Sequence, residues 1–376
     1  MPTEMSPAVD AVQIPLDHPR DTAGLAKLIA DGRIDPDKII AITGKTISST
    51  RVEDSRVDAD QSLRALLAET GSRTNQEIEE IPMVFTAGIA GLLTPQIVVF
   101  SRYQDEPSSD AAGRLAVGTA RSAIMQPEWV GGLQVVQANA DTVRRAAADA
   151  GIDPTGVEYV VGKAYHPLQE EIQAARERGH DIAEIDDAAL FRKTSGSAGL
   201  GIGVATEGLD VTDPSTIGDV TVWTGRSAVS ANGWEPVGGD GPHTKLIAFG
   251  NRVGAGGRLR VGHAVMSDLL DVHALPRALR AAGLDVADGP LTEDQRKRVV
   301  SVYVKISGAP EGGLRGRRQV TENPGYDTKT AVAGMLAGWL QDTLLWISAS
   351  AVQQGPPGGG TIGVIVDVGE TPTFRV

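Results

Sequence analysis

The sequence predicts an α/β protein made of three similar α/β repeat domains around a pseudo-threefold axis, with a barrel-like centre. The first observation behind this fold class is an internal repeat: residues 30–45 (ADGRIDPDKIIAITGK) and 148–163 (ADAGIDPTGVEYVVGK) share seven identical positions. The second is that the helix and strand patterns around this repeat occur a third time further along the chain. A length of 376 residues allows two or three domains of roughly 150 residues each, and the repeat selects three.

An amphipathic helix is expected ahead of the first strand of each unit. Apolar residues recur at helical spacing in 24–32, 142–151 and 276–285, and each segment reaches a glycine that suits a helix C-terminus. In the third unit a charged insertion at 293–298 separates the helix from its strand.

Two strands are expected in each unit. The first is apolar and ends in lysine, at 39–45 (IIAITGK), 157–163 (VEYVVGK) and 299–305 (VVSVYVK). The second passes directly into small and hydroxyl residues, at 83–88, 220–233 and 344–351. Polar and turn residues become frequent near 104–112 and 250–257, which predicts domains at 1–104, 113–250 and 255–376.

The composition narrows the class of protein. With 35 basic and 48 acidic side chains the formal net charge is −13, which argues against nucleic acid and anionic membranes as partners. The chain has no cysteine, so disulfides and thiolate chemistry are excluded. No apolar signal segment stands at the amino terminus, and we expect a cytoplasmic location. Residues 81–101 carry no charge, but their prolines and polar residues favour two buried strands over a membrane helix.

The lysines that end the three apolar strands, Lys45, Lys163 and Lys305, are the strongest local signal for chemistry. Burial disfavours the charged form of a lysine and lowers its pKa toward the range in which it can act as a base. One such lysine alone is more typical of a strand-end charge that reaches solvent. Three at equivalent positions of a repeat favour a shared site.

Hydroxyl residues at the ends of the partner strands, Thr86, Ser230 and Ser348, complement these lysines. A serine needs a nearby base to become a nucleophile, and a neutral lysine can supply it. For any one hydroxyl alone, a hydrogen bond to its own backbone is the more common role. The prediction therefore rests on three pairs, which are Lys45 with Thr86, Lys163 with Ser230, and Lys305 with Ser348.

Two glycine-rich segments have competing interpretations. Segment 353–361 (QQGPPGGGT) suits either a backbone cradle for an ion or substrate, or a tight turn before the last strand. Segment 196–203 (GSAGLGIG) has the wrong spacing for a dinucleotide fingerprint, so a packed helix or a strand start is favoured. The six histidines show no metal-ligand spacing.

Seven short motifs together resemble the ring-opening amidohydrolase family of cyanuric acid hydrolases and barbiturases. They are AITGKT (41–46), VVGK (160–163), GLGIGVATE (199–207), GHAVMSD (262–268), VYVK (302–305), LRGRRQ (314–319) and QGPPGGG (354–360). The resemblance covers essentially the whole chain. It implies three similar domains with one active site at their centre, hydrolysis of an amide bond in a small cyclic imide or ureide, and a homotetramer.

The resemblance also implies roles for individual residues. Ser230 matches a family serine that attacks a ring carbonyl, with Lys163 as its base, although one inserted residue, Asn232, precedes the next glycine. The other residues expected to bind the substrate are Lys45, Arg56, Thr86, Ala87, Ser195, Ala231, Lys305, Lys329, Ser348 and Ala349.

The chain departs from the family pattern at residues that hold the substrate and a metal. Ser195 and Lys329 stand where the family has its second and third arginines. The metal-ligating glutamate is Ser307 here, and a family Glu-His pair is Val352 and Gln353. Arginine binds planar carbonyls in a fork that serine cannot replace. We therefore expect a small cyclic amide other than cyanuric acid or barbiturate as substrate, and no metal or other cofactor.

Two other functions stay open at this point. The altered arginines also suit a protein that binds a small ring without hydrolysing it. The lysines also suit a lyase or isomerase that uses them as acid and base, whose product would gain no water.

Overall fold

The strands of the computed structural model form three mixed sheets with one shared topology. The structure describes residues 5–47, 55–180, 182, 186–231, 242–308, 313–318 and 324–369. Within these residues, each sheet has its strands in the order first, fourth, second, third of the repeat. The first and second strands run antiparallel to the fourth, and the second and third run parallel to each other. This common topology confirms the fold class expected from the repeat.

The helices and strands of each repeat follow one plan. The first repeat contains β1 (Ser6–Pro15), α1 (Ala23–Ala30), β2 (Ile39–Lys45), α2 (Ser55–Thr70), α3 (Asn75–Glu80), β3 (Met83–Thr86) and β4 (Gln96–Asp105). The second contains β5 (Arg114–Arg121), α4 (Leu133–Ala150), β6 (Val157–Ala164), α5 (Gln169–Glu177), α6 (Asp187–Thr206), β7 (Ser227–Ala231) and β8 (Lys245–Arg252). The third contains β9 (Leu259–Met266), α7 (Ala274–Ala281), α8 (Glu293–Arg298), β10 (Val299–Ile306), α9 (Pro324–Leu340), β11 (Trp346–Ser348) and β12 (Gly360–Asp367).

The Ile-Asp-Pro sequence shared by the first two repeats has a local structural cause. Asp35 and Asp153 each cap a short 3-10 turn, at Pro36–Lys38 and Pro154–Gly156, by accepting from the backbone N–H two residues on. Proline suits the first position of such a turn, because its missing N–H would have no partner there. The turn directs the chain from the helix into the strand that ends in lysine.

A glycine in the left-handed region follows the predicted helix in each repeat. Gly32, Gly151 and Gly283 have φ values of 68°, 68° and 90° after α1, α4 and α7. These values favour glycine, because a side chain would clash with the following carbonyl. The helix ends expected from the sequence are thereby confirmed.

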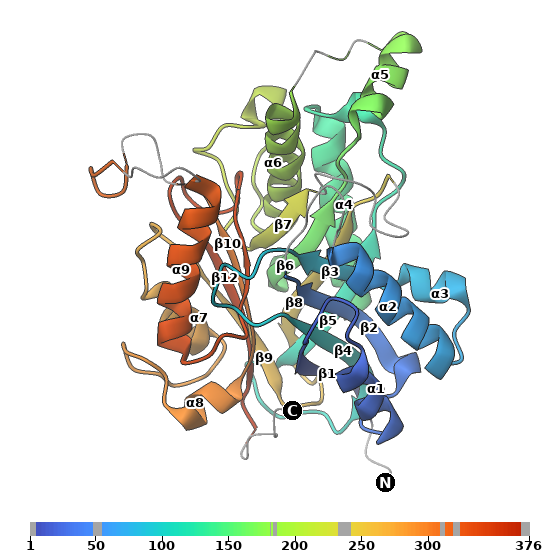
Figure 1. Ribbon diagram of the computed structural model, residues 1–376, viewed down its shortest axis with the longest axis vertical. Helices are drawn as coiled ribbons and strands as arrows, with labels where there is room; N and C mark the ends of the chain where they lie inside the picture. The colour runs from blue at the N-terminus through green and yellow to red at the C-terminus, as the bar shows by residue number, and fades with distance from the viewer. Residues whose placement is uncertain are drawn as a thin grey trace.

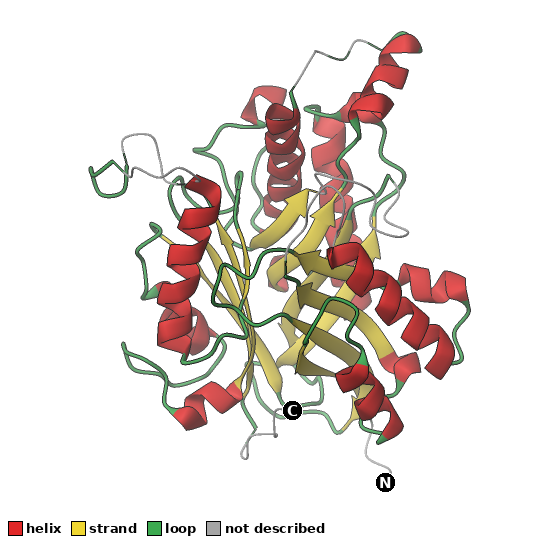
Figure 2. Ribbon diagram, in the orientation of Figure 1, coloured by secondary structure: helices red, strands yellow, loops and turns green. Residues whose placement is uncertain are grey.

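The three sheets enclose a common core, and helices cover their outer faces (Figure 1 and Figure 2). Aromatic rings from all three repeats meet in this core: Phe249 lies 5.3 Å from Phe100 and 5.8 Å from Tyr303, between ring centroids. The Tyr303 hydroxyl lies 2.8 Å from the Thr43 hydroxyl of the first repeat. Thr43 and Tyr303 stand two residues before Lys45 and Lys305, on the same faces of their strands. The aromatic core therefore lies next to the strand-end lysines.

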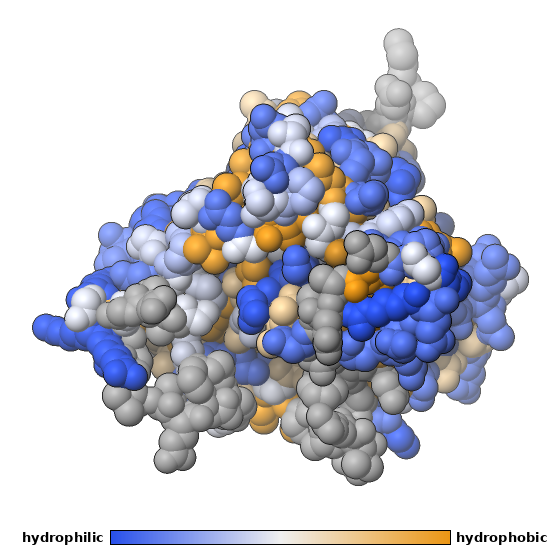
Figure 3. All heavy atoms as spheres, turned by 90° about the horizontal axis from the view of Figure 1, so that it is seen from above, coloured by the Kyte–Doolittle hydropathy of each residue, from blue (hydrophilic) through white to orange (hydrophobic). Residues whose placement is uncertain are grey.

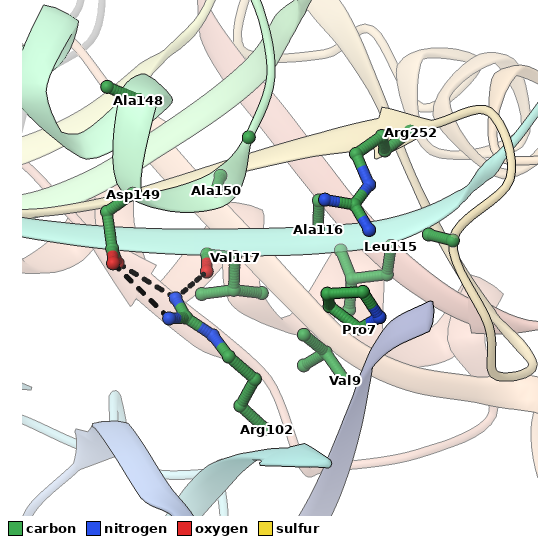
Figure 4. Close-up of a pocket in the computed structure, with 12 residues that line it drawn as sticks. Pro7, Val9, Arg102, Leu115, Ala116, Val117, Ala148, Asp149, Ala150 and Arg252 are labelled. Carbon is green, nitrogen blue, oxygen red and sulfur yellow. Dashed lines mark hydrogen bonds and ion pairs between the residues drawn. The ribbon is translucent and has the colours of Figure 1, made fainter. Parts of the chain in front are cut away.

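Neighbouring repeats are joined by side chains that bind the backbone of the next sheet. Arg102 of β4 donates to Val117 O of β5 at 2.8 Å and pairs with Asp149 of α4 at 2.8 Å (Figure 4). Asn251 of β8 exchanges two hydrogen bonds with the backbone of Val261 on β9, at 2.8 and 3.0 Å. The pocket drawn in Figure 4 has a volume of about 120 Å³, and none of the predicted site residues lines it.

Some element limits differ from the sequence prediction. The strand expected over 220–233 is confined to 227–231 within the described residues, because 220–226 forms turns, one capped by the Asp219 carboxylate. The helix expected at 142–151 begins at Leu133. Segment 196–203 lies inside α6, where glycine allows close packing: a Cβ at Gly201 would lie 2.6 Å from Val136 O of α4. Segment 81–101 contains β3 and the first part of β4, so two strands lie there, as expected.

The helices of the described residues include none that is long and apolar enough to cross a membrane. Seen from above, hydrophilic residues lie round much of the rim of the molecule, and hydrophobic residues are more frequent near the middle (Figure 3).

Candidate active site

The parallel strand pairs bring each predicted lysine beside a hydroxyl residue. The register matches Lys45 with Thr86, Lys163 with Ser230, and Lys305 with Ser348. Residues matched in this way lie on the same face of a sheet. The three pairs expected from the sequence are therefore strand neighbours.

The side chains of these pairs are buried at the centre. Lys45 and Lys305 are 0% exposed and Lys163 is 6% exposed, and the three hydroxyl residues are also buried. A buried lysine is unusual, because moving an ammonium out of water is unfavourable. Three together mark this region as the candidate active site.

Lys305 connects two repeats. Its amine donates to Ser348 Oγ at 3.1 Å and to Ala349 O at 2.8 Å in its own repeat, and to Ser230 Oγ at 3.0 Å in the second repeat. Ser230 Oγ and Ser348 Oγ lie 2.8 Å apart. One serine hydroxyl thus contacts a second hydroxyl and a buried amine.

Lys45 reaches across to the third repeat in the same way. Its amine donates to Ala87 O at 3.0 Å and to Ile347 O at 2.8 Å. Lys329, near the start of α9, also donates to Ala87 O, at 3.4 Å. Two amines therefore share one carbonyl oxygen at the end of β3.

These lysines lower one another's pKa. Burial holds the pKa of Lys45 well below its usual range, and the charges of Lys329 and of the two other strand lysines lower it further. Burial also holds the pKa of Lys305 well below its usual range, with smaller effects from Lys163 and Lys329. The pKa of Lys329 is lowered by burial. The centre therefore favours neutral amines, which can accept a proton.

Comparison with known proteins identifies the family. Residues 10–367 match the family model described as amidohydrolase ring-opening protein. The chain belongs to the ring-opening amidohydrolase family. It is 32% identical to barbiturase 1 of a Nocardioides species, over 97% of this chain and 100% of that one. It is 35% identical to a cyanuric acid amidohydrolase of a Bradyrhizobium species, over 98% and 100%.

Solved structures of this family share the fold. A cyanuric acid hydrolase structure, described as an evolutionary innovation by structural concatenation, matches with a TM-score of 0.86 and 28% identity, over 96% of this chain and 100% of that one. A crystal structure of cyanuric acid hydrolase from A. caulinodans matches with a TM-score of 0.83 and 30% identity, over the same shares.

The remaining predicted residues of this amidohydrolase lie on helices and strand ends. Arg56 is buried in the first turn of α2. Ser195 is fully buried in α6, and its hydroxyl has no hydrogen-bond partner among the described residues. Ala231 ends β7 and is buried. Ala87 O accepts from Lys45 and Ala349 O accepts from Lys305. Lys329 shares the Ala87 carbonyl with Lys45. Asn232 lies outside the described residues.

The possible metal ligands around segment 353–360 do not fit the divalent cation that the resemblance implies. Ser307 donates to Gly359 O from its backbone N–H at 2.9 Å and from its hydroxyl at 3.0 Å. The Gln354 side-chain oxygen accepts from Val229 N and Ser227 Oγ. Hard cations prefer several oxygen ligands that include carboxylates. No cluster of three or more His, Cys, Asp or Glu that could hold a metal occurs in the described residues.

Sequence reasoning misses a fourth buried lysine on a central strand. Lys245 is 3% exposed, and the β6–β8 register pairs it with Lys163. Cross-strand partners lie on one face, so this residue lies beside Lys163. The apolar run KLIAFG, which Lys245 begins, indicates a buried strand. Lys245 stands at the start of this strand, whereas the three predicted lysines end theirs.

Proposed function

We propose that this amidohydrolase opens the ring of a small cyclic amide, with Ser230 as nucleophile and Lys163 as its general base. The observation that carries the proposal is the environment of the Ser230 hydroxyl. It is buried, lies beside Lys163 in the sheet, and is 3.0 Å from the Lys305 amine. A neutral lysine beside a buried serine supplies the base that nucleophilic attack requires.

The proposed reaction has two stages. Lys163 takes the proton of the Ser230 hydroxyl while its oxygen attacks a ring carbonyl, and the developing oxyanion is stabilised by donors of the site. The ring C–N bond then breaks, the nitrogen receives the proton from Lys163, and the opened chain stays attached to Ser230 as an ester. Water, deprotonated by Lys163, attacks the ester carbonyl, the bond to Ser230 Oγ breaks, and Lys163 returns the proton to that oxygen.

Lys305 is the competing candidate for the base. Its direct contact with Ser230 Oγ and its lowered pKa favour it. Its amine also donates to Ser230 Oγ, Ser348 Oγ and Ala349 O, and an N–H donor at Ser230 Oγ would stabilise negative charge on that oxygen. We assign proton transfer to Lys163 and this stabilising role to Lys305, and alanine variants of the two lysines separate them.

The substrate that we propose is a cyclic amide or imide other than cyanuric acid and barbiturate. Ser195 and Lys329 stand where the resemblance implies arginines, and neither can bind a planar carbonyl in a bidentate fork. A ring with fewer carbonyls needs fewer such contacts. Thr86, Ser348 and the backbone after each hydroxyl are proposed to hold the remaining ring positions.

A panel of ring compounds tests this proposal. Purified full-length protein is incubated with cyanuric acid, barbituric acid, cyclic imides and lactams, and products are followed by time-resolved mass spectrometry. We expect a product heavier by one water, formed faster from a simpler cyclic amide than from the two acidic rings. Binding of every ring without a mass change would favour a non-hydrolytic protein, and a product of unchanged mass would favour an isomerase.

The homotetramer, the cytoplasmic location and the domain limits near 104, 113, 250 and 255 stay predictions. Light scattering of the purified chain tests the first of these, because a tetramer has four times the mass of the 39.3 kDa protomer.

A further inference from the structure

The strand that carries Ser230 lies at the edge of its sheet. β7 pairs with β6 on one side only in the order β5-β8-β6-β7. The backbone groups on the other side of an edge strand need partners, because buried N–H and C=O groups without hydrogen bonds are unfavourable. Val229, directly before Ser230, has its N–H and C=O on that open side.

The side chain of Gln354 from the third repeat supplies these partners. Val229 N donates to its Oε1 at 2.7 Å, and its Nε2 donates to Val229 O at 2.9 Å. Ser227 Oγ donates to the same Oε1 at 2.8 Å. The Gln354 side chain is 0% exposed. One carboxamide thus takes the place of a neighbouring strand beside Val229.

The backbone of this segment is fixed on the second repeat as well. Thr224 N donates to Gln353 O at 3.0 Å, and Gly355 N donates to Thr224 O at 2.8 Å. The Gln353 Nε2 atom donates to the carbonyls of Thr216, Asp219 and Val222, at 2.8, 3.0 and 3.0 Å. Gln353 has a left-handed φ of 57°, which is unfavourable in a non-glycine residue and needs such contacts.

Coverage of an edge by another repeat also occurs on β11. Ile347 stands directly before Ser348, as Val229 stands before Ser230, and its carbonyl accepts from Lys45 of the first repeat at 2.8 Å. The two edges differ in one respect. On β7 a single side chain, that of Gln354, binds both the N–H and the C=O of the residue before the serine.

We propose that Gln354 is a positioning residue for the nucleophile. It acts through Val229 and touches neither the reacting atoms nor the lysines, and it fixes β7 so that Ser230 stays beside Lys163 and 3.0 Å from the Lys305 amine. This inference rests on the proposed function, because it takes Ser230 as the nucleophile.

Replacing Gln354 by glutamate changes one atom of this contact. The carboxylate still accepts from Val229 N but cannot donate to Val229 O, and its charge faces that carbonyl oxygen. The strand must move away or the contact must open. A displacement of roughly 1 Å at a catalytic group lowers a rate by about 100-fold.

The chain offers a matched control in Asn251. Its carboxamide binds the N–H and C=O of Val261 in the same way and also joins two repeats, but β9 carries none of the proposed site residues. Asn251→Asp therefore introduces the same defect, a carboxylate facing a backbone carbonyl, away from the nucleophile.

The experiment compares Gln354→Glu and Asn251→Asp in the full chain. Hydrogen exchange of peptides covering 227–231 measures how well the backbone amides of β7 are protected. The rate at which a fluorophosphonate modifies Ser230, followed by intact mass and peptide mapping, measures the reactivity of the Ser230 hydroxyl. We expect Gln354→Glu to speed exchange in 227–231 and to slow modification by about 100-fold. Asn251→Asp is expected to leave the exchange in 227–231 and the rate of Ser230 modification near the wild-type values. We expect it to lower the melting temperature about as much as Gln354→Glu does.

Unchanged exchange in 227–231, or equal modification rates in the two variants, overturns the positioning role. Modification of Ser230→Ala at the wild-type rate instead refutes the proposed nucleophile, and the exchange result then decides by itself whether Gln354 holds β7. If Gln354→Glu does not fold, Gln354→Met removes both hydrogen bonds without adding a charge and is judged by the same two measurements.

Discussion

The Lys305 amine lies 3.0 Å from Ser230 Oγ, although the two residues belong to different repeats. The Lys45 amine contacts Ile347 O in the third repeat in a comparable way. Each of these lysines therefore completes a site that its own repeat does not contain. The three repeats therefore share one buried cluster of amines and hydroxyls, at the place where their sheets meet.

Replacing each of two lysines by alanine separates the base from the stabilising amine. Lys163→Ala should lower kcat/KM by about 100-fold to 10,000-fold, because it removes the group that accepts the serine proton. Lys305→Ala should cause a smaller loss and move the acidic limb of the pH profile to higher pH, since removing a positive neighbour makes the remaining amines easier to protonate. A larger loss in Lys305→Ala than in Lys163→Ala, with the acidic limb absent from the residual activity of the Lys305 variant, would assign the base to Lys305.

The free energy of unfolding should rise with pH in the range below the ordinary lysine pKa of 10.5. The pKa values of Lys45, Lys305 and Lys329 are lowered in the folded state, so the unfolded chain binds more protons there and the free energy of unfolding increases as pH rises. Lys305→Met should flatten this dependence. Urea unfolding at pH 7, 8 and 9 measures it, and an equal slope in the variant would refute the lowered pKa.

Chelation of divalent cations should change neither activity nor thermal stability, because Ser307 stands where the family has a metal-ligating glutamate and its hydroxyl donates to Gly359 O instead. A gain-of-function variant sharpens this test. Ser307→Glu places a carboxylate beside the carbonyl of Gly359, and we expect its melting temperature to rise when Ca²⁺ or Mg²⁺ is added. A fall in wild-type melting temperature with EDTA would contradict the account.

Lys329→Ala should weaken substrate binding more than it slows the reaction. Its amine donates to the Ala87 carbonyl that Lys45 also contacts, and loss of one hydrogen-bond donor is expected to raise KM about tenfold with a small change in kcat. Lys297→Ala serves as the control, because Lys297 forms an exposed ion pair with Glu293 on α8. A loss confined to kcat would place Lys329 in the chemical step instead.

Local patterns were sufficient to predict the repeat and the strand neighbours. Lysine at the end of an apolar strand and a hydroxyl at the end of the next one are properties of a short segment, and the register of Lys163 with Ser230 follows from them. Three copies of one pattern then required three similar sheets.

Contacts between repeats could not be predicted in the same way. The reach of Lys305 to Ser230 depends on how two sheets meet, which no local pattern determines. Segment 353–361 likewise suits a backbone cradle or a tight turn on its residues alone, and only its position beside β7 reveals that Gln354 binds Val229. Lys245 was missed because a lysine at the start of a strand is ordinarily solvent-exposed.

The most direct test of the central claim is rapid-quench intact mass spectrometry of the full chain with the cyclic amide that it turns over fastest. Attack by Ser230 opens the ring without releasing a fragment, so the account predicts a transient species heavier by the whole mass of the ring compound. Peptide mapping should locate the added mass on Ser230, and Ser230→Ala should show neither adduct nor turnover. Turnover by Ser230→Ala at the wild-type rate, or an adduct on another residue, would contradict the account.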